Sequence, residues 1–148
     1  MFQGETAITI DDKGRLAIPT AYRELVARDC GNRLVLVYNV YDAGCLWLLQ
    51  HAQWEALRDQ LNARGMQSAQ VRALRRKLVA SAVVVEPDGN GRIPLPASMR
   101  ANAGIDRKAV LLGIGDRFEL WGEQEYQMHM RQTLGDADLD DALRDLPL

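Results

Sequence analysis

The sequence has few of the residues that bind metals or form disulfides. Its 148 residues include two cysteines, Cys30 and Cys45, and two histidines, His51 and His129. So few thiols and imidazoles do not supply the closely spaced ligands of a tetrahedral metal site. We therefore expect no metal ion and no other cofactor. The low cysteine content fits a cytoplasmic chain with reduced thiols, and pairing of Cys30 with Cys45 stays an open alternative.

Long apolar runs are also missing. No segment approaches the roughly 18 uncharged apolar residues that read as a membrane span. Residues 1–5 lack the basic start and apolar core of a signal peptide. Hydrophobic residues make up 47% of the chain and charged residues 26%, which is typical of a soluble globular protein. We therefore expect a cytoplasmic protein that does not use a membrane as a partner.

The motifs of common enzyme classes are absent from the sequence. It contains neither a G-x-x-x-x-G-K-[ST] phosphate loop nor a G-x-G-x-x-G turn. A cysteine beside His51 would lack a third group to orient the imidazole, as nucleophilic catalysis requires. We therefore predict that the chain is not an enzyme, a small hydrolase included, and we find no sign of a small-molecule ligand.

The net charge of −2 argues mildly against a nucleic-acid partner, but the charge is unevenly distributed. Five acidic residues and one basic residue follow Gly135 and give this tail a charge of −4, so residues 1–135 carry +2. Salt screens charges beyond roughly 8 Å, and short-range contacts therefore depend on local charge. DNA binding by the body of the chain remains compatible with this balance.

The chain does contain one motif written twice. The pattern D-x-x-G-R-x-x-x-P-x-x-x-R occurs at residues 11–23 and again, 77 residues later, at residues 88–100. The matched pairs are Asp11 with Asp88, Gly14 with Gly91, Arg15 with Arg92, Pro19 with Pro96 and Arg23 with Arg100. Similar apolar patterns follow both copies, which indicates an internal duplication.

Each copy predicts about four strands and one short helix. In the motif, an aspartate opens the turn by accepting backbone N–H groups, and a glycine supplies the positive φ of a tight reversal. We expect strands near residues 8–10, 16–18, 34–38, 46–49, 109–114 and 118–121, and a helix from Pro19, in its first position, to about Ala27. A unit of about 50 residues buries too little surface alone. The copies should therefore share one core in an α+β, mainly β, fold.

A helical hairpin is predicted between the copies, punctuated by Gly65 and Ser68. Its apolar positions, at helical spacing, are Trp54, Leu57 and Leu61, then Val71, Leu74 and Leu78. Its second helix also carries Arg72, Arg75, Arg76 and Lys77. These cations either form a solvated face or contact DNA phosphates or an acidic patch on a neighbouring subunit. A last short helix is expected to hold Tyr126, Met130 and Leu134, before the acidic tail.

The repeated turns are the candidate binding site. Lys13, Arg15 and Arg23 are expected to cluster at one hairpin, and Asn90, Arg92 and Arg100 at the other. Arginine donates in a fork that suits phosphate oxygens or a guanine edge, and a two-stranded ribbon fits the major groove. The alternative is that Arg15 and Arg92 only hold Asp11 and Asp88 in local ion pairs. The spacing leaves both interpretations open.

The repeated motif resembles the swapped-hairpin domain of the AbrB and SpoVT class of bacterial transition-state regulators and antitoxins. Two copies joined by a helical insert that contains residues 70–78 resemble the MraZ family, as do residues 1–4 and 46–48. The resemblance implies two pseudo-symmetric AbrB-like units in one intertwined, β-barrel-like body. The units are residues 5–50 and 79–126, with the insert at 51–78 and the C-terminal helix and acidic tail at 127–148.

The MraZ resemblance also implies a function. Members repress their own division and cell-wall operon by binding direct repeats upstream of it, associate with the nucleoid and form ring-shaped homo-oligomers. The family's DNA contacts map onto Arg15 with Lys13 and, through the internal match, onto Arg92; Arg23 matches an arginine used in the wider AbrB class. Asn90 replaces Lys13 in the second copy, so we expect the first turn to dominate binding.

Two other kinds of partner compete with duplex DNA. An antitoxin-like protein-interaction module would use the same basic face to bind an acidic protein. An RNA binder is less favoured, because single-stranded bases usually stack on aromatic rings and we expect no exposed aromatic residues interleaved with the basic ones.

Overall fold

A computed structural model describes residues 1–148, apart from the side chain of Asp136. The first half contains β1 (Phe2–Thr9), β2 (Arg15–Ala17), α1 (Thr20–Asp29), β3 (Leu34–Tyr38), β4 (Cys45–Gln50), α2 (His51–Ala63), α3 (Ala69–Arg75) and the π turn η1 (Arg76–Ala80). The second half contains β5 (Val83–Val85), β6 (Arg92–Pro94), α4 (Ala97–Asn102), β7 (Lys108–Gly115), β8 (Arg117–Gly122), α5 (Glu123–Arg131) and the 3-10 turns η2 (Asp136–Asp138) and η3 (Asp141–Leu143).

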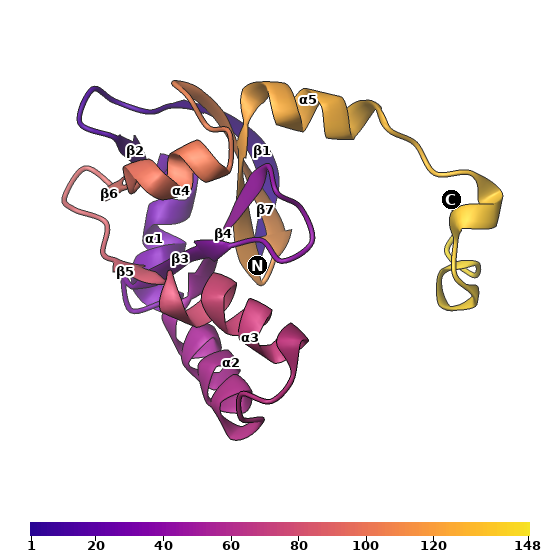
Figure 1. Ribbon diagram of the computed structural model, residues 1–148. Coiled ribbons are helices and arrows are strands. Elements are labelled where there is room, and N and C mark those ends of the chain that lie inside the picture. Colours follow the sequence, from indigo (N-terminus) through magenta and orange to yellow (C-terminus); the bar gives the residue numbers. More distant parts are fainter.

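The strands form two antiparallel sheets to which both halves of the chain contribute (Figure 1). The six-stranded sheet has the order β1-β7-β8-β4-β3-β5, and β2 pairs with β6 in a separate two-stranded sheet. Strand β1 of the first half therefore pairs with β7 of the second half, and β5 of the second half pairs with β3 of the first half. Exchange of the two halves reverses this order onto itself, which makes the sheet pseudo-symmetric. The expected α+β fold of mainly strands is confirmed.

The central strands are buried on both faces of the larger sheet. Leu34 and Leu36 of β3 point into one apolar cluster, and Val35 and Val37 point into the other, as alternating side chains must. The first cluster is covered by β2, β6, α1 and α4, through Leu16, Ile93, Val26 and Met99. The second is covered by α2, η1 and α5, through Leu61, Leu78 and Tyr126. The two copies of the motif thus lie on the face opposite the helical insert.

Four of the expected strands coincide with β3, β4, β7 and β8 to within a residue or two. The first strand begins at Phe2, well before Ile8, because its partner β7 belongs to the other half of the chain. Pro19 occupies the position before the helix and not its first turn, since its ψ of 141° is extended. The helix continues past Ala27 to Asp29, and the Val26 carbonyl accepts the Cys30 N–H at 3.0 Å.

The insert folds as two helices joined by a short connection. The Ser68 hydroxyl accepts hydrogen bonds from the backbone N–H groups of Gln70 (3.2 Å) and Val71 (3.4 Å) and so caps α3. The indole of Trp54 donates to the Leu78 carbonyl at 2.7 Å and ties α2 to η1. Among the described residues, no helix combines the length and apolarity needed to cross a membrane.

The C-terminal region differs from the expectation. Tyr126 is buried on α5, but Met130 is 64% exposed, and Leu134 lies beyond the end of the helix and is 74% exposed. Cys30 and Cys45 are both free thiols, and burial raises the pKa of Cys45.

Candidate nucleic-acid interface

The first turn is built around the carboxylate of Asp11. Its Oδ1 accepts the backbone N–H groups of Lys13 at 2.9 Å and Arg15 at 2.8 Å. The Asp11 carbonyl accepts the Gly14 N–H at 3.0 Å, and Gly14 has a φ of +74°, which favours glycine. The bond from the Arg15 N–H is the main cause that lowers the pKa of Asp11.

The second turn has the same backbone geometry. Oδ1 of Asp88 accepts the N–H groups of Asn90 and Arg92, both at 2.9 Å. Gly91 has the same φ of +74°, and its N–H donates to the Asp88 carbonyl at 2.9 Å. The pKa of Asp88 is also lowered, mainly by the bond from the Arg92 N–H. Both sequence motifs therefore specify the same Asp–Gly turn.

The two turns meet in the β2–β6 ribbon. In its antiparallel register, Leu16 pairs with Ile93, and both side chains are fully buried. Arg15 pairs with Pro94, and Arg92 pairs with Ala17. Because successive side chains of a strand alternate between faces, Arg15 and Arg92 both project from the outer face of the ribbon, diagonally across the buried pair. Arginines 77 positions apart in sequence thus share one exposed surface.

The side chains of these two arginines differ in their contacts. Nε of Arg15 donates to Oδ2 of Asp11 at 2.9 Å, and the Arg15 side chain is one-third exposed. Arg92 is exposed, and within the part of the chain that the structure describes it forms no ion pair with Asp88. A local ion pair with the turn aspartate is therefore present for Arg15 and absent for Arg92, which bonds Asp88 through its backbone N–H. Lys13 and Asn90 are exposed at the two tips.

The sequence suggested that Arg23 and Arg100 each cluster with the turn of their own copy. In the structure each lies against the turn of the other copy. Arg23 donates from Nε to the Ile18 carbonyl at 2.8 Å and lies against Gly91 of the second turn, where an added Cβ would collide with it. A terminal nitrogen of Arg100 lies 3.5 Å from the position of a Cβ on Gly14 of the first turn. The cause is the pairing of β2 with β6, which brings the helix that follows each motif next to the turn of the other copy.

The crossing is held by two further backbone bonds. The Ile18 N–H donates to the Gly91 carbonyl at 2.7 Å, and the Leu95 N–H donates to the Gly14 carbonyl at 2.9 Å. The glycine carbonyl of each turn therefore bonds the residue that follows the strand of the other copy. Arg23 and Arg100 lie against the turns of the other copy, and the surface that faces outward includes Lys13, Arg15, Asn90 and Arg92.

Comparison with known proteins agrees with this arrangement. The sequence profile of a family described as "MraZ protein, putative antitoxin-like" matches the chain twice, at residues 1–77 and 78–144. The chain belongs to the MraZ family. The two matches begin 77 residues apart, which is the offset that superimposes the two turns.

Three relatives show how far the similarity to MraZ proteins extends, and each is named "Transcriptional regulator MraZ". The protein of Stenotrophomonas maltophilia (strain R551-3) is 59% identical over 148 residues, which is 100% of both chains. The protein of Xanthomonas campestris pv. campestris (strain 8004) is 58% identical over the same full length. That of Marinobacter nauticus is 35% identical over 147 residues, covering 99% of this chain and 98% of the relative.

One cation beside the first turn lies outside the MraZ motif. Arg107 forms an ion pair with Asp12 at 3.2 Å, and its side chain is 67% exposed. Its carbonyl accepts the Ile10 N–H at 2.7 Å, which places the loop before β7 next to the first turn. No feature of the sequence pointed to Arg107, because it belongs to the other half of the chain and to neither copy of the motif.

Proposed function

We propose that this MraZ-family chain binds duplex DNA through the outer face of the β2–β6 ribbon and thereby regulates transcription. The observation that carries the proposal is that Arg15, one-third exposed, and Arg92, exposed, lie on the same face of one ribbon, one from each copy. A two-stranded ribbon fits the major groove, and arginine forks suit both phosphate oxygens and guanine edges. The names of the relatives, all transcriptional regulators, support the same function.

The chemistry of Arg15 supports a dominant role for the first turn. Of the Arg15 guanidinium, Asp11 accepts only the Nε–H, so the two terminal nitrogens remain available to a phosphate or a guanine. The ion pair orders this side chain before DNA arrives. Arg92 has no such partner among the described residues, and ordering a long side chain costs up to about 2 kcal/mol. Lys13 adds a second cation to the first turn, whereas the equivalent position of the second turn is the uncharged Asn90.

Affinity and specificity require more than one chain. Residues 1–135 carry only +2, which is too little for tight binding to a phosphate backbone. We propose a homo-oligomeric ring in which neighbouring subunits engage successive direct repeats, so that multivalency supplies the affinity. The target we propose is the region upstream of its own division and cell-wall operon, which the chain would repress as a cytoplasmic, nucleoid-associated protein. Each chain would contribute one AbrB-type swapped-hairpin pair.

The test is a gel shift with DNA from upstream of the protein's own gene, in excess nonspecific DNA and at two salt concentrations. We expect a specific, strongly salt-dependent shift for the wild type, because phosphate contacts release counterions. Arg15→Ala should abolish the shift. Arg64→Ala is the matched control, since Arg64 is exposed after the end of α2, on the insert. Light scattering on each variant establishes that the assembly is intact.

A second candidate is an antitoxin-like module whose basic ribbon binds an acidic protein, a function that the "antitoxin-like" description of the family also favours. Absence of a specific shift from the intact wild-type assembly would contradict the DNA proposal and favour this candidate.

A further inference from the structure

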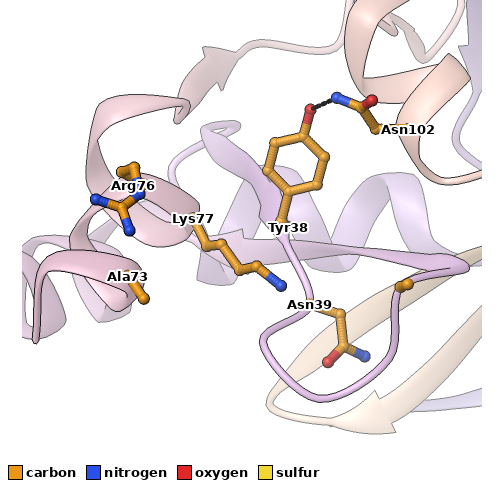
Figure 2. Close-up of a pocket in the computed structure, with 7 residues that line it drawn as sticks. Tyr38, Asn39, Ala73, Arg76, Lys77 and Asn102 are labelled. Atoms are coloured by element: carbon orange, nitrogen blue, oxygen red, sulfur yellow. Dashed lines mark hydrogen bonds between the residues drawn. The ribbon is translucent and has the colours of Figure 1, made fainter. Parts of the chain in front are cut away.

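A groove runs between the helical insert and the loop that joins β3 to β4. One hollow, of about 420 Å³, is lined by Tyr38, Asn39, Arg76, Lys77 and Asn102 (Figure 2). A second hollow of the same volume adjoins it and is lined by Val40, Tyr41 and Leu74. Ala73 and Lys77 border both hollows, so we treat them as one surface and call it the α3 groove. Such volumes fall within the roughly 300–1,000 Å³ of pockets that enclose ligand groups.

The α3 groove carries unbalanced positive charge. Residues 69–80 contain three arginines, one lysine and no acidic residue. None of the four cations forms an ion pair in the part of the chain that the structure describes; Arg72 donates to the Met66 carbonyl at 2.8 Å and Arg75 to Oδ1 of Asn62 at 2.7 Å, both neutral acceptors. Figure 2 shows the Lys77 side chain crossing the hollow toward Asn39.

Apolar surface accompanies this charge. Tyr41, on the groove wall, is 84% exposed and therefore leaves an aromatic ring in water. Val40 and Leu74 are only partly buried against the second apolar cluster. An apolar floor with a cationic border selects a segment that alternates apolar and acidic side chains.

The C-terminal tail of the chain has that composition. Residues 134–148 contain five aspartates, one arginine and five leucines, which gives a net charge of −4 against +4 for residues 69–80. Leu134 is 74% exposed, Leu143 44% and Leu148 93%. Figure 1 shows the tail standing away from the body of the molecule. The backbone at Gln132, which follows α5, is extended, with a ψ of 133°, so the helix stops and the chain leads outward.

We propose that the tail of one copy of this chain docks in the α3 groove of a second copy. The tail's leucines would cover Val40, Tyr41 and Leu74, and its aspartates would face Arg76 and Lys77. The occupant belongs to a second copy because the tail turns away from its own body, although α5 lies beside its own β3–β4 loop, with His129 3.6 Å from Asp42. This contact rests on the proposed self-association and is independent of DNA binding.

The experiment places a photo-crosslinking benzoyl-phenylalanine at position 41 of the full-length chain. Tyr41 is suitable because it is almost fully exposed. The probe-bearing chain is refolded together with an equal amount of ¹⁵N-labelled chain that lacks the probe, then irradiated without DNA. Mass spectrometry of the cross-linked peptides is expected to show labelled residues 134–148 joined to position 41. Cross-links to unlabelled tail alone, to other segments, or none at all in an intact oligomer would overturn the proposal.

A charge test accompanies the cross-link. Changing Asp138, Asp140 and Asp141 of the tail to Asn is expected to reduce the labelled cross-link about tenfold, because the negative charges that would face Arg76 and Lys77 are lost. The matched control changes three exposed acidic residues elsewhere: Glu24→Gln, Asp59→Asn and Asp106→Asn. An equal loss in the control would overturn specific docking. Because no DNA is present, failure here leaves the DNA proposal standing, and failure of the gel shift leaves this cross-link unaffected.

Discussion

The two Asp–Gly turns share a backbone but not their side-chain contacts. Both have an aspartate that accepts two N–H groups and a glycine at φ +74°. Only in the first turn, however, does the arginine form an ion pair with the aspartate. Only in the second turn is the glycine so close to a helix arginine, Arg23, that an added Cβ would collide with it. The duplicated backbone bonds preserve the turn, and the side chains around it are free to differ. A pseudo-symmetric ribbon can therefore present two unequal halves.

The largest expected difference between the turns is the effect of glycine substitution on stability. Gly91→Ala forces a Cβ into a positive φ and against Arg23, which we expect to cost about 2–4 kcal/mol of unfolding free energy. Gly14→Ala meets Arg100 only at ordinary contact distance and should cost about 1–2 kcal/mol. Urea unfolding of the two variants measures the difference. Equal losses would show that the collision with Arg23 relaxes without cost.

A double-mutant cycle sharpens the same comparison. In an Arg23→Ala background the collision disappears, so the added cost of Gly91→Ala should fall by about 1–2 kcal/mol. Gly14→Ala serves as the control, because Gly14 is not in contact with Arg23. Its cost should stay the same in both backgrounds. If the cost of Gly91→Ala also stays the same, the contact between Arg23 and Gly91 does not contribute to the cost of that substitution.

The next largest difference is expected in DNA affinity. Arg15→Ala should weaken binding to the specific site by about 10- to 100-fold per engaged subunit, in line with the roughly 1–3 kcal/mol of a good arginine–base contact. Arg92→Ala should cost severalfold less, since this side chain must first be ordered. Quantitative gel shifts at one fixed salt concentration measure both. Equal losses would contradict dominance of the first turn.

A smaller effect concerns how Arg15 is oriented. Asp11→Asn keeps an oxygen for the backbone N–H groups but removes the charge that holds Nε of Arg15. We expect a loss of DNA affinity of about two- to fivefold, because an exposed ion pair contributes only about 0.2–1 kcal/mol. Asp88→Asn has no paired arginine to release and is the matched control. An equal effect of both changes would mean that the Asp11–Arg15 pair plays no part in binding.

The smallest expected effect is on acid stability. The pKa values of Asp11 and Asp88 are lowered in the fold from an ordinary value of 3.8. Near and below this value the unfolded state binds more protons, so both groups stabilise the fold above it and lose that contribution as the pH falls through the lowered pKa. Melting temperatures measured from pH 5 to pH 3 should therefore fall less in Asp11→Asn and Asp88→Asn than in wild type. A steeper fall in either variant would contradict the lowered pKa.

Local patterns in the sequence predicted much of the fold. Strands β3, β4, β7 and β8 and the two turns were found because each has an apolar run or an Asp–Gly signal of its own. Most of β1 was missed, since residues 2–7 show little alternation and the partner of this strand is more than 100 positions away. The packing of Arg23 on Gly91 could not be predicted either, because the residue spacing within one copy carries no information about how the two copies pack on each other.

The sequence by itself determined that one unit occurs twice, that each copy turns at an aspartate and a glycine, and which family the chain belongs to. These features depend on residue type and short spacing, which are readable without coordinates. Only the tertiary structure decided that the copies exchange β1 and β5, that Arg15 and Arg92 share one face, and that Arg23 and Arg100 support the opposite turns. Those outcomes depend on strand pairing between distant segments, where burial of Leu16 against Ile93 sets the register and so determines which side chains face outward.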